Sequence, residues 1–209
     1  LCASGLMALV IINDSVRGGE IDIGVGGGVE SISLVQTERM NTHRSVDPWI
    51  NDHRPDIYMS MLETAEIVAA RYGVSREAQD DYAAESHRRT HLAQQDGRFD
   101  AEIVSMPSVM KVKDKETGEV SDRAVELAAD EGVRPQTTVE GLQGLQPVFR
   151  DGQQLAEGVC VTAGNASQLS DGASALVVME AAEASRRGLA PLGCLRGIAV
   201  SGCDPDEMG

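Results

Sequence analysis

Aromatic side chains are scarce in this sequence of 209 residues, which has one tryptophan, three tyrosines and two phenylalanines. A chain of this length can bury a substantial core, in one large domain or two small ones. That core must therefore be built from aliphatic residues and methionine. Long apolar runs are also missing, since no stretch approaches the length of a membrane span. We therefore expect no membrane-spanning helix.

Positive charge is in short supply. The sequence has 18 lysines and arginines against 33 aspartates and glutamates, which gives a formal net charge of -15. This balance argues against nucleic acid as a partner. It also argues against long-range steering of an anionic substrate, so any bound phosphate must be held by a few local arginines.

Cysteine spacing excludes a further class of site. The four cysteines, Cys2, Cys160, Cys194 and Cys203, form no C-x-x-C pair and show no zinc-ligand spacing. We therefore expect no metal site, and the cysteines fit a reducing compartment better than a disulfide framework.

The first 18 residues combine a cysteine with a strongly apolar segment. Small residues occupy positions 3–5, an apolar run without proline follows at 6–12, and Gly18 closes the segment. This pattern predicts a buried helix whose first turn carries Cys2. A helix N-terminus favours a thiolate over a thiol, and the small neighbours leave room for an acyl group. The alternative is that Cys2 is a small buried hydrophobe, which is the commoner role of a cysteine.

Hydrophobic periodicity and turn residues divide the remaining chain into alternating helices and strands. Ser60 with Glu63 forms a capping box that opens a helix to Tyr72, and Ser75 caps a longer polar helix ended by Gly97. Strands are expected at 20–28, 99–104, 109–113, 173–179 and 192–200. A second capping box is expected at Thr137 and Glu140, and a further helix at 180–187. This order suits an α/β layer with a domain inserted into it.

Six blocks follow one another along the chain in a fixed order. They are C-A-S-G-L-M-A-L at 2–9, G-G-V-E-S-I-S at 27–33, Met61 with T-A-E at 64–66, S-R-E-A-Q-D at 75–80, G-R-F with E-I-V between 97 and 104, and V-T-A-G-N-A-S with D-G-A between 161 and 173. Together they resemble motifs of the thiolase family. One block would be weak evidence, but six colinear blocks that span the chain are strong evidence.

The resemblance implies an α/β fold with a layered αβα core and an inserted α+β loop domain. Residues 1–31 and 170–209 would be parts of the core, namely part of the nucleophile-bearing half and the start of the second half. Residues 32–169 would be the loop domain. Because the sequence starts inside an active-site motif, we expect both ends of the natural chain to be missing.

The resemblance also implies a reaction. Cys2 would be the nucleophile in the thiolytic cleavage of a 3-ketoacyl-CoA to acetyl-CoA and a shortened acyl-CoA, as in fatty acid degradation. The family's G-H-P-x-G, E-A-F and C-x-G-G-G motifs, which supply further catalytic groups, do not occur in these 209 residues. We therefore expect this piece alone to be inactive. Coenzyme A is a substrate here, and no cofactor is implied.

Six further residues match family positions that bind coenzyme A or line the path to the nucleophile. Arg134 matches an arginine near the nucleotide, and Phe149 matches an aromatic residue beside adenine and pantetheine. Ala163 and Ser167 match residues that contact the pantetheine arm. Met61 and Met208 match methionines that line the approach to the nucleophile. The complete protein would be a homodimer or homotetramer. It would lie in the cytoplasm, or in the mitochondrial or peroxisomal matrix of a eukaryote.

Three alternatives stay open at this point. The first is a biosynthetic thiolase that condenses two acetyl-CoA molecules, and the second is a thiolase-like protein that binds acyl-CoA or lipid without turnover. The third is a redox-sensing cysteine protein, which would need a resolving cysteine near Cys2. Leu62 and Gly141 depart from the residues often found at their positions in the family, which leaves the acyl-chain preference open.

Overall fold

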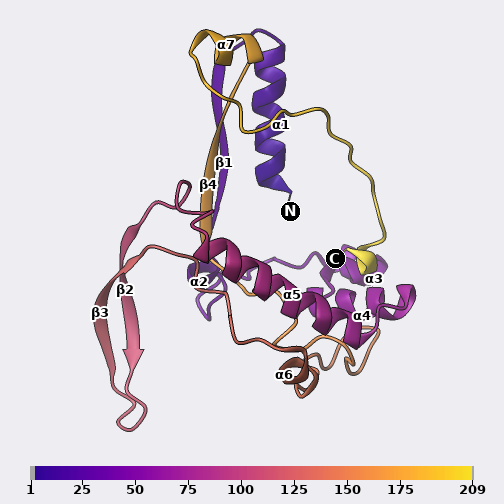
Figure 1. Ribbon diagram of the computed structural model, residues 1–209. Coiled ribbons are helices and arrows are strands. Elements are labelled where there is room, and N and C mark those ends of the chain that lie inside the picture. Colours follow the sequence, from indigo (N-terminus) through magenta and orange to yellow (C-terminus); the bar gives the residue numbers. More distant parts are fainter. Residues whose placement is uncertain (1–2, 209) are drawn as a thin grey trace. The chain divides into compact units, whose positions relative to one another are not determined.

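The computed structural model describes residues 3–208 and divides the chain into two compact units (Figure 1). The first unit comprises residues 1–45 and 169–203, and the second comprises 46–168 and 204–209. The chain thus leaves the first unit, builds most of the second, and returns. The boundaries expected for the core and the loop domain, at 32 and 169, stay a prediction.

The first unit is built on a two-stranded antiparallel sheet. Strand β1 (Ile23–Glu30) pairs with β4 (Gly172–Met179) in a register that runs from Ile23 opposite Met179 to Glu30 opposite Gly172. Both strands confirm predictions from the sequence. Helix α1 (Ser4–Arg17) packs against both strands, as Figure 1 shows. The unit also contains α2 (Ile32–Val35) and α7 (Ala181–Arg186).

Glycine in β1 lets α1 approach the strand closely. A Cβ on Gly26 would stand 2.8 Å from Leu9 Cδ2 and 3.3 Å from the Leu9 backbone, and one on Gly24 would stand 2.5 Å from Ile12 Cγ2. The predicted helix is confirmed, but its complete burial is wrong among the described residues, because Val10 alone in α1 is buried. A two-stranded sheet covers only one face of a helix.

One aspartate joins the end of β1 to the start of β4. The Asp171 carboxylate accepts the backbone N–H of Ser33 (2.9 Å) and the Ser33 hydroxyl, just after β1 and just before β4. These bonds tie the chain that follows β1 to the chain that precedes β4 within the first unit. They also give a physical role to two of the sequence blocks.

The second unit is mainly helical. It contains α3 (Pro48–His53), the 3-10 helix η1 (Pro55–Tyr58), α4 (Met61–Tyr72), α5 (Arg76–Gln95), α6 (Val139–Gln143) and the 3-10 helix η2 (Pro205–Glu207). Ser60 Oγ accepts the Glu63 N–H (3.2 Å), and Ser75 Oγ accepts the Ala78 N–H (3.1 Å), so both predicted N-caps are confirmed. Gly73 ends α4 in the left-handed region with φ 66°.

A long hairpin extends the second unit. Strand β2 (Met106–Lys113) pairs with β3 (Val120–Leu127), from Met106 opposite Leu127 to Lys113 opposite Val120. The strand predicted at 99–104 is wrong. After Gly97, which has φ 66°, Phe99 O accepts the N–H groups of Glu102 (3.0 Å) and Ile103 (3.1 Å), so the segment forms turns.

Two smaller predictions need correction. The N-cap of α6 is Thr138, whose Oγ1 accepts the Gly141 N–H (3.2 Å), and not Thr137. Residues 192–200, predicted as a strand, have no regular structure. No strand among the described residues lies alongside this segment to pair with its backbone. Its apolar side chains are exposed, and Val200 is 84% exposed.

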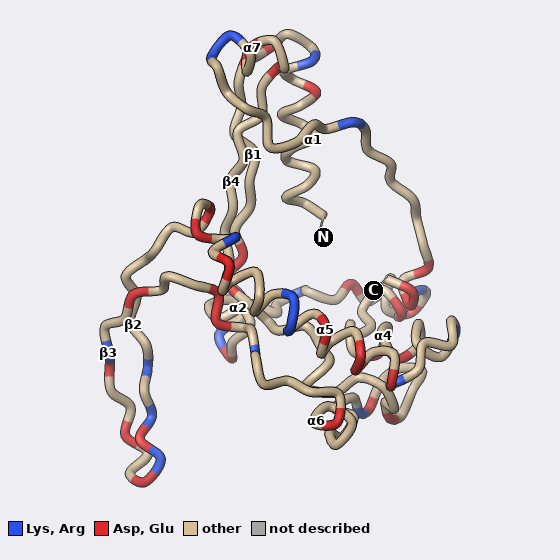
Figure 2. The backbone as a smooth tube through the Cα atoms, in the orientation of Figure 1, with Lys and Arg blue, Asp and Glu red and all other residues tan. Residues whose placement is uncertain are grey.

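The structure agrees with the acidic composition of the sequence and with its lack of long apolar runs. Figure 2 shows acidic residues along elements of both units. Of the helices that the structure describes, none is long and apolar enough to cross a membrane.

Candidate functional site

The candidate nucleophile lies outside the described residues. Cys2 comes directly before Ala3, the N-cap of α1, whose carbonyl accepts the Met7 N–H (2.9 Å). The first turn of α1 contains no acidic residue that would oppose a negative charge at this end of the helix. The described part of α1 therefore provides the electrostatic setting that a thiolate at this terminus requires.

Of the three cysteines that the structure describes, Cys160 is poorly suited to nucleophilic chemistry. All three are free, with Cys160 buried and Cys194 and Cys203 exposed. Burial, followed by the negative charge of Glu66, raises the pKa of the Cys160 thiol. A raised pKa lowers the thiolate fraction, so Cys160 is a structural cysteine.

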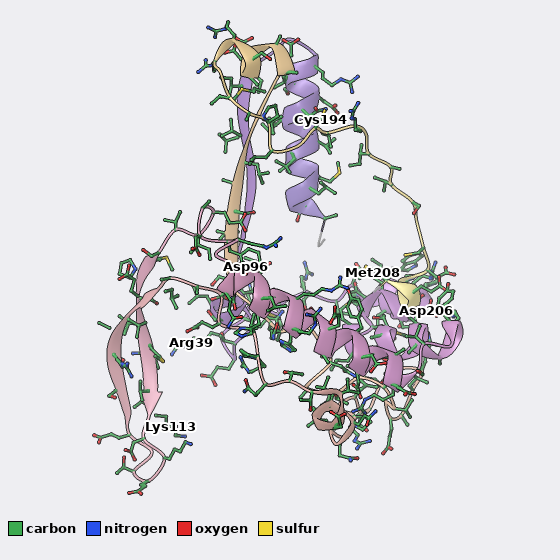
Figure 3. All side chains as sticks on the ribbon, viewed as in Figure 1. Arg39, Asp96, Lys113, Cys194, Asp206 and Met208 are labelled. Carbon is green, nitrogen blue, oxygen red and sulfur yellow. The ribbon has the colours of Figure 1, made fainter. Side chains whose placement is uncertain are left out.

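All six residues predicted to contact substrate belong to the second unit. Met61 opens α4 and Met208 follows η2, and both side chains are exposed. Arg71, near the end of α4, pairs with Asp206 (2.7 Å) and with Glu207. Figure 3 labels Asp206 of η2 and Met208, which directly follows η2. These ion pairs hold η2 at the C-terminal end of α4, whereas Met61 lies at the other end.

Arg134 is held on the surface beside α5. Its backbone N–H donates to His87 Nδ1 (3.2 Å), and its guanidinium donates to the carbonyl of Glu131 (3.0 Å). Gln94 also binds this loop, through the carbonyl of Asp130 (3.1 Å). The loop thus presents one exposed cation at a fixed place on α5. His87, which was not predicted as a site residue, is an anchor of that loop.

Phe149 packs as a core residue, with 5% of its surface exposed. Any side chain on Gly152 would collide with the Phe149 ring, and a Cβ on Gly158 would stand 2.9 Å from Phe149 Cβ. Backbone bonds from Val148 N to Val161 O (3.0 Å) and from Gly158 N to Phe149 O (3.1 Å) enclose it. Phe149 therefore holds together the segments on either side of it.

Ala163 and Ser167 are exposed on one turn, residues 162–167, which we call the 162–167 turn. Thr162 Oγ1 accepts the N–H groups of Gly164 and Asn165 (both 3.3 Å), and Asn165 Oδ1 accepts the Thr162 N–H (2.8 Å). These local bonds fix the backbone and leave Ala163 and Ser167 on the outside.

Three buried carboxylates, which were not predicted as site residues, hold separate loop segments between residues 153 and 165 in place. Glu63, Glu66 and Asp80 are 1%, 3% and 0% exposed. Glu63 accepts the backbone N–H groups of residues 153, 154 and 155 at 2.6–3.0 Å. The expected return of its side chain to the Ser60 N–H, as in a full capping box, is therefore wrong: the Glu63 side chain binds a distant loop instead.

Glu66 and Asp80 act on the segment that contains the 162–167 turn. Glu66 accepts the N–H groups of residues 159, 160 and 161 at 2.7–3.0 Å. Asp80 accepts Asn165 Nδ2 (2.9 Å) and pairs with Arg76 (2.8 Å). Glu66 and Asp80 fall inside two of the six blocks, and Arg76 with Asp80 forms an i,i+4 pair on α5. The bonds to residues 159–161 and to Asn165 join positions about 85–95 apart and leave no local pattern in the sequence.

Glu63 should make the second unit sensitive to acid. Burial raises its pKa, but hydrogen bonds from the N–H groups of Gln154, Gln153 and Leu155 outweigh burial and lower it below the ordinary 4.5. A lowered folded-state pKa gives stability that is present above the unfolded-state pKa and is lost as pH falls through the folded-state value. The Glu63→Gln variant should therefore lose less stability than the unaltered protein when the pH falls below 4.5.

Thermal unfolding between pH 6 and pH 3 measures this effect. Glu140→Gln is the matched control, because it removes the same charge from an exposed site, and it should keep the acid sensitivity of the unaltered protein. Identical pH profiles for Glu63→Gln and Glu140→Gln would contradict the role of Glu63.

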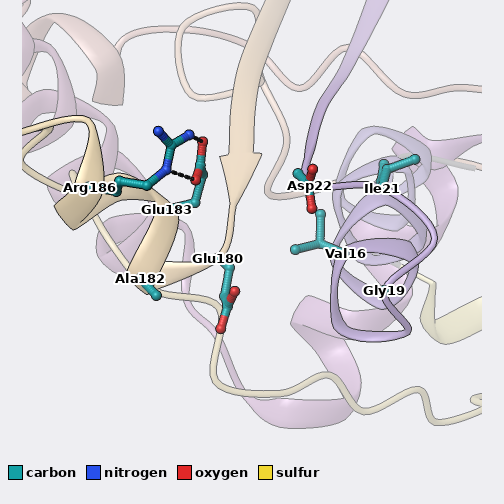
Figure 4. Close-up of a pocket in the computed structure, with 8 residues that line it drawn as sticks. All are labelled: Val16, Gly19, Ile21, Asp22, Glu180, Ala182, Glu183 and Arg186. Carbon is teal, nitrogen blue, oxygen red and sulfur yellow. Dashed lines mark hydrogen bonds and ion pairs between the residues drawn. The ribbon is translucent and has the colours of Figure 1, made fainter.

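A shallow depression in the first unit does not fit an acyl site (Figure 4). It measures about 240 Å³ and lies where the end of α1 meets α7. Arg186, the only cation among the described residues that line it, already pairs with Glu183 (2.6 Å), and the other charged lining residues, Asp22 and Glu180, are acidic. The depression is at the opposite end of α1 from Cys2. Within residues 3–208, no cluster of metal-binding side chains is present.

The sequence of the chain and the mixed α/β fold of the first unit match one protein family. The chain belongs to the thiolase family, because the family described as "Thiolase, N-terminal domain" matches residues 1–182. The full sequence is 41% identical to human peroxisomal 3-ketoacyl-CoA thiolase, over 100% of this chain and 46% of the relative.

Two solved structures are similar in fold and sequence. Human mitochondrial 3-ketoacyl-CoA thiolase in complex with CoA matches with a TM-score of 0.72 and 32% identity, over 100% of this chain and 50% of that one. The dimeric peroxisomal thiolase of Saccharomyces cerevisiae matches with a TM-score of 0.70 and 30% identity, over 90% and 44%. The chain thus spans about half the length of these relatives.

Proposed function

We propose that a protein carrying these residues cleaves 3-ketoacyl-CoA by thiolysis. The Cys2 thiolate adds to the keto carbon, and the bond between that carbon and the adjacent α-carbon breaks. The α-carbon takes a proton, equivalent to the one that Cys2 gave up, and leaves as acetyl-CoA. The thiolate of a free coenzyme A then attacks the cysteinyl thioester. This step releases a shortened acyl-CoA and restores Cys2.

The sequence identity of about 40% to 3-ketoacyl-CoA thiolases along the entire chain carries this proposal. It favours degradation over the biosynthetic alternative, because the relatives are named 3-ketoacyl-CoA thiolases. Two observations support Cys2 as the nucleophile. It directly precedes the N-cap of helix α1, Ala3, which makes no side-chain capping bond, and the first turn of α1 has no acidic residue. The pKa of the Cys160 thiol is raised.

We further propose that the second unit binds coenzyme A. Arg134 would hold a phosphate of the nucleotide, Ala163 and Ser167 would border the pantetheine arm, and Met61 and Met208 would line the approach to Cys2. Phe149 would act mainly as the support of the 162–167 turn, since it is buried. The layered αβα core, assembly as a homodimer or homotetramer, and a cytoplasmic or organelle-matrix location belong to the same proposal.

The test is a thiolysis assay on the complete protein. A 3-ketoacyl-CoA and free coenzyme A are supplied, and acetyl-CoA and the shortened acyl-CoA should appear in equal amounts. Binding of coenzyme A without any acetyl-CoA would contradict the proposal and favour a non-catalytic acyl-CoA-binding protein.

Arg134→Ala should weaken the binding of coenzyme A by about 1–2 kcal/mol, because a charge-assisted contact to phosphate is lost. Transfer of the acyl group to pantetheine, which lacks the nucleotide, should proceed as before. Arg89→Ala is the control, because Arg89 is an exposed arginine of α5 that pairs only with Glu85 among the described residues. Equal losses with coenzyme A and with pantetheine would show that Arg134 supports the loop instead.

A further inference from the structure

The 162–167 turn is held by two carboxylates on two different helices. Glu66, on α4, accepts the three N–H groups that lead directly into the turn, with the shortest bond to Val161 (2.7 Å). Asp80, on α5, holds the Asn165 side chain inside the turn (2.9 Å). The entrance and the middle of the turn are thus fixed independently.

Both anchors are shielded from water, which makes them hard to replace. Glu66 and Asp80 are almost fully buried, and Thr162 at the start of the turn is 0% exposed. A Cβ on Gly158 would stand 2.5 Å from Glu66 Oε1, so the backbone lies directly against the carboxylate. Losing such a buried acceptor would leave backbone N–H groups unpaired, and the segment would have to move.

We propose that Glu66 and Asp80 are positioning residues for coenzyme A, acting through the 162–167 turn. Neither carboxylate touches the substrate, and each sets where Ala163 and Ser167 stand. The inference rests on the proposed function, in which this turn borders the pantetheine arm. It predicts that loosening the turn weakens the use of coenzyme A more than it slows the chemical steps at Cys2.

Glu63 provides a matched control on the same helix. Glu63 is also buried and also accepts three backbone N–H groups, but from residues 153–155, which contain none of the proposed contacts. In each glutamate, replacement by glutamine turns one accepting oxygen into an N–H donor that faces backbone N–H groups. Both variants should therefore lose similar stability, and only one should disturb the turn.

The experiment compares Glu66→Gln and Glu63→Gln in the complete protein, with kcat and KM measured for coenzyme A in thiolysis. Glu66→Gln should raise KM about tenfold while kcat changes about twofold or less. Glu63→Gln should leave KM unchanged. Equal KM values for the two variants, whether both raised or both unaltered, would overturn the inference.

Asp80→Asn tests the second anchor, which lies on α5. The KM of this variant for coenzyme A should also rise. Hydrogen exchange on the unaltered protein needs no variant: saturating coenzyme A should slow exchange at 162–167 and leave 153–155 unaffected. Uniform slowing, or none at the turn, would contradict the inference. If the unaltered protein binds no coenzyme A, the proposed function fails as well, whereas binding with no effect of Glu66→Gln refutes the positioning role alone.

Discussion

Cys2→Ala should reduce thiolysis by at least about 10⁴-fold, because both half-reactions pass through the sulfur and alanine offers no nucleophile. The binding of coenzyme A should stay within about twofold of the unaltered protein, since every proposed contact with it lies in the second unit. Steady-state thiolysis and equilibrium binding of coenzyme A measure the two quantities on the same preparation.

The matched control is Cys203→Ala, which removes an exposed thiol from an extended segment and should leave the rate unaltered. Residual thiolysis within a factor of ten of the unaltered protein in Cys2→Ala would show that the acyl group takes another route. Loss of coenzyme A binding together with activity would show that Cys2 supports the fold.

The largest effect on stability is expected for Asp80→Ala. Asp80 is fully buried and joins α5 to the 162–167 turn through Asn165, and it also pairs with Arg76 at 2.8 Å. Its removal leaves a cavity, costs the Asn165 amide one of its hydrogen bonds, and leaves a partly buried guanidinium without its carboxylate. Because Arg76 keeps the carbonyls of Leu142 (2.6 Å) and Leu145 (3.2 Å), we expect a loss of about 3 kcal/mol.

Thermal unfolding at a fixed scan rate measures this loss, and the midpoint should fall by about 6–12 °C. Glu85→Ala is the control, because Glu85 also pairs with arginines of α5 but at the surface. Its midpoint should hardly change. Equal shifts in the two variants would contradict the anchoring role of Asp80.

The local elements were largely predictable because their signals are local. Ser60 and Ser75 cap helices through their own side chains, and Gly73 ends one with a positive φ. The strands predicted at 109–113 and 173–179 also follow from short patterns of residues, whereas β3 was not predicted. Each of these features depends on neighbours within a few positions.

The anchors of the loop segments were not predictable in the same way. Glu63 fits a capping box in sequence, but its side chain bonds to N–H groups about 90 positions away. Phe149 matches a ligand contact by motif, and only the close packing of Gly152 and Gly158 reveals it as core. The strand expected at 192–200 has suitable residues but no partner strand among those described. The structure of such residues and segments depends on contacts with residues that are distant in the sequence.

Mapping of the acyl adduct tests the central claim most directly. The complete protein is incubated with a 3-ketoacyl-CoA without free coenzyme A, quenched with acid, digested, and analysed by mass spectrometry. We predict that the shortened acyl group is found on Cys2 and is removed when coenzyme A is added before the quench. An acyl group on Cys160, Cys194 or Cys203, with Cys2 unmodified, would contradict the assignment of the nucleophile and the mechanism built on it.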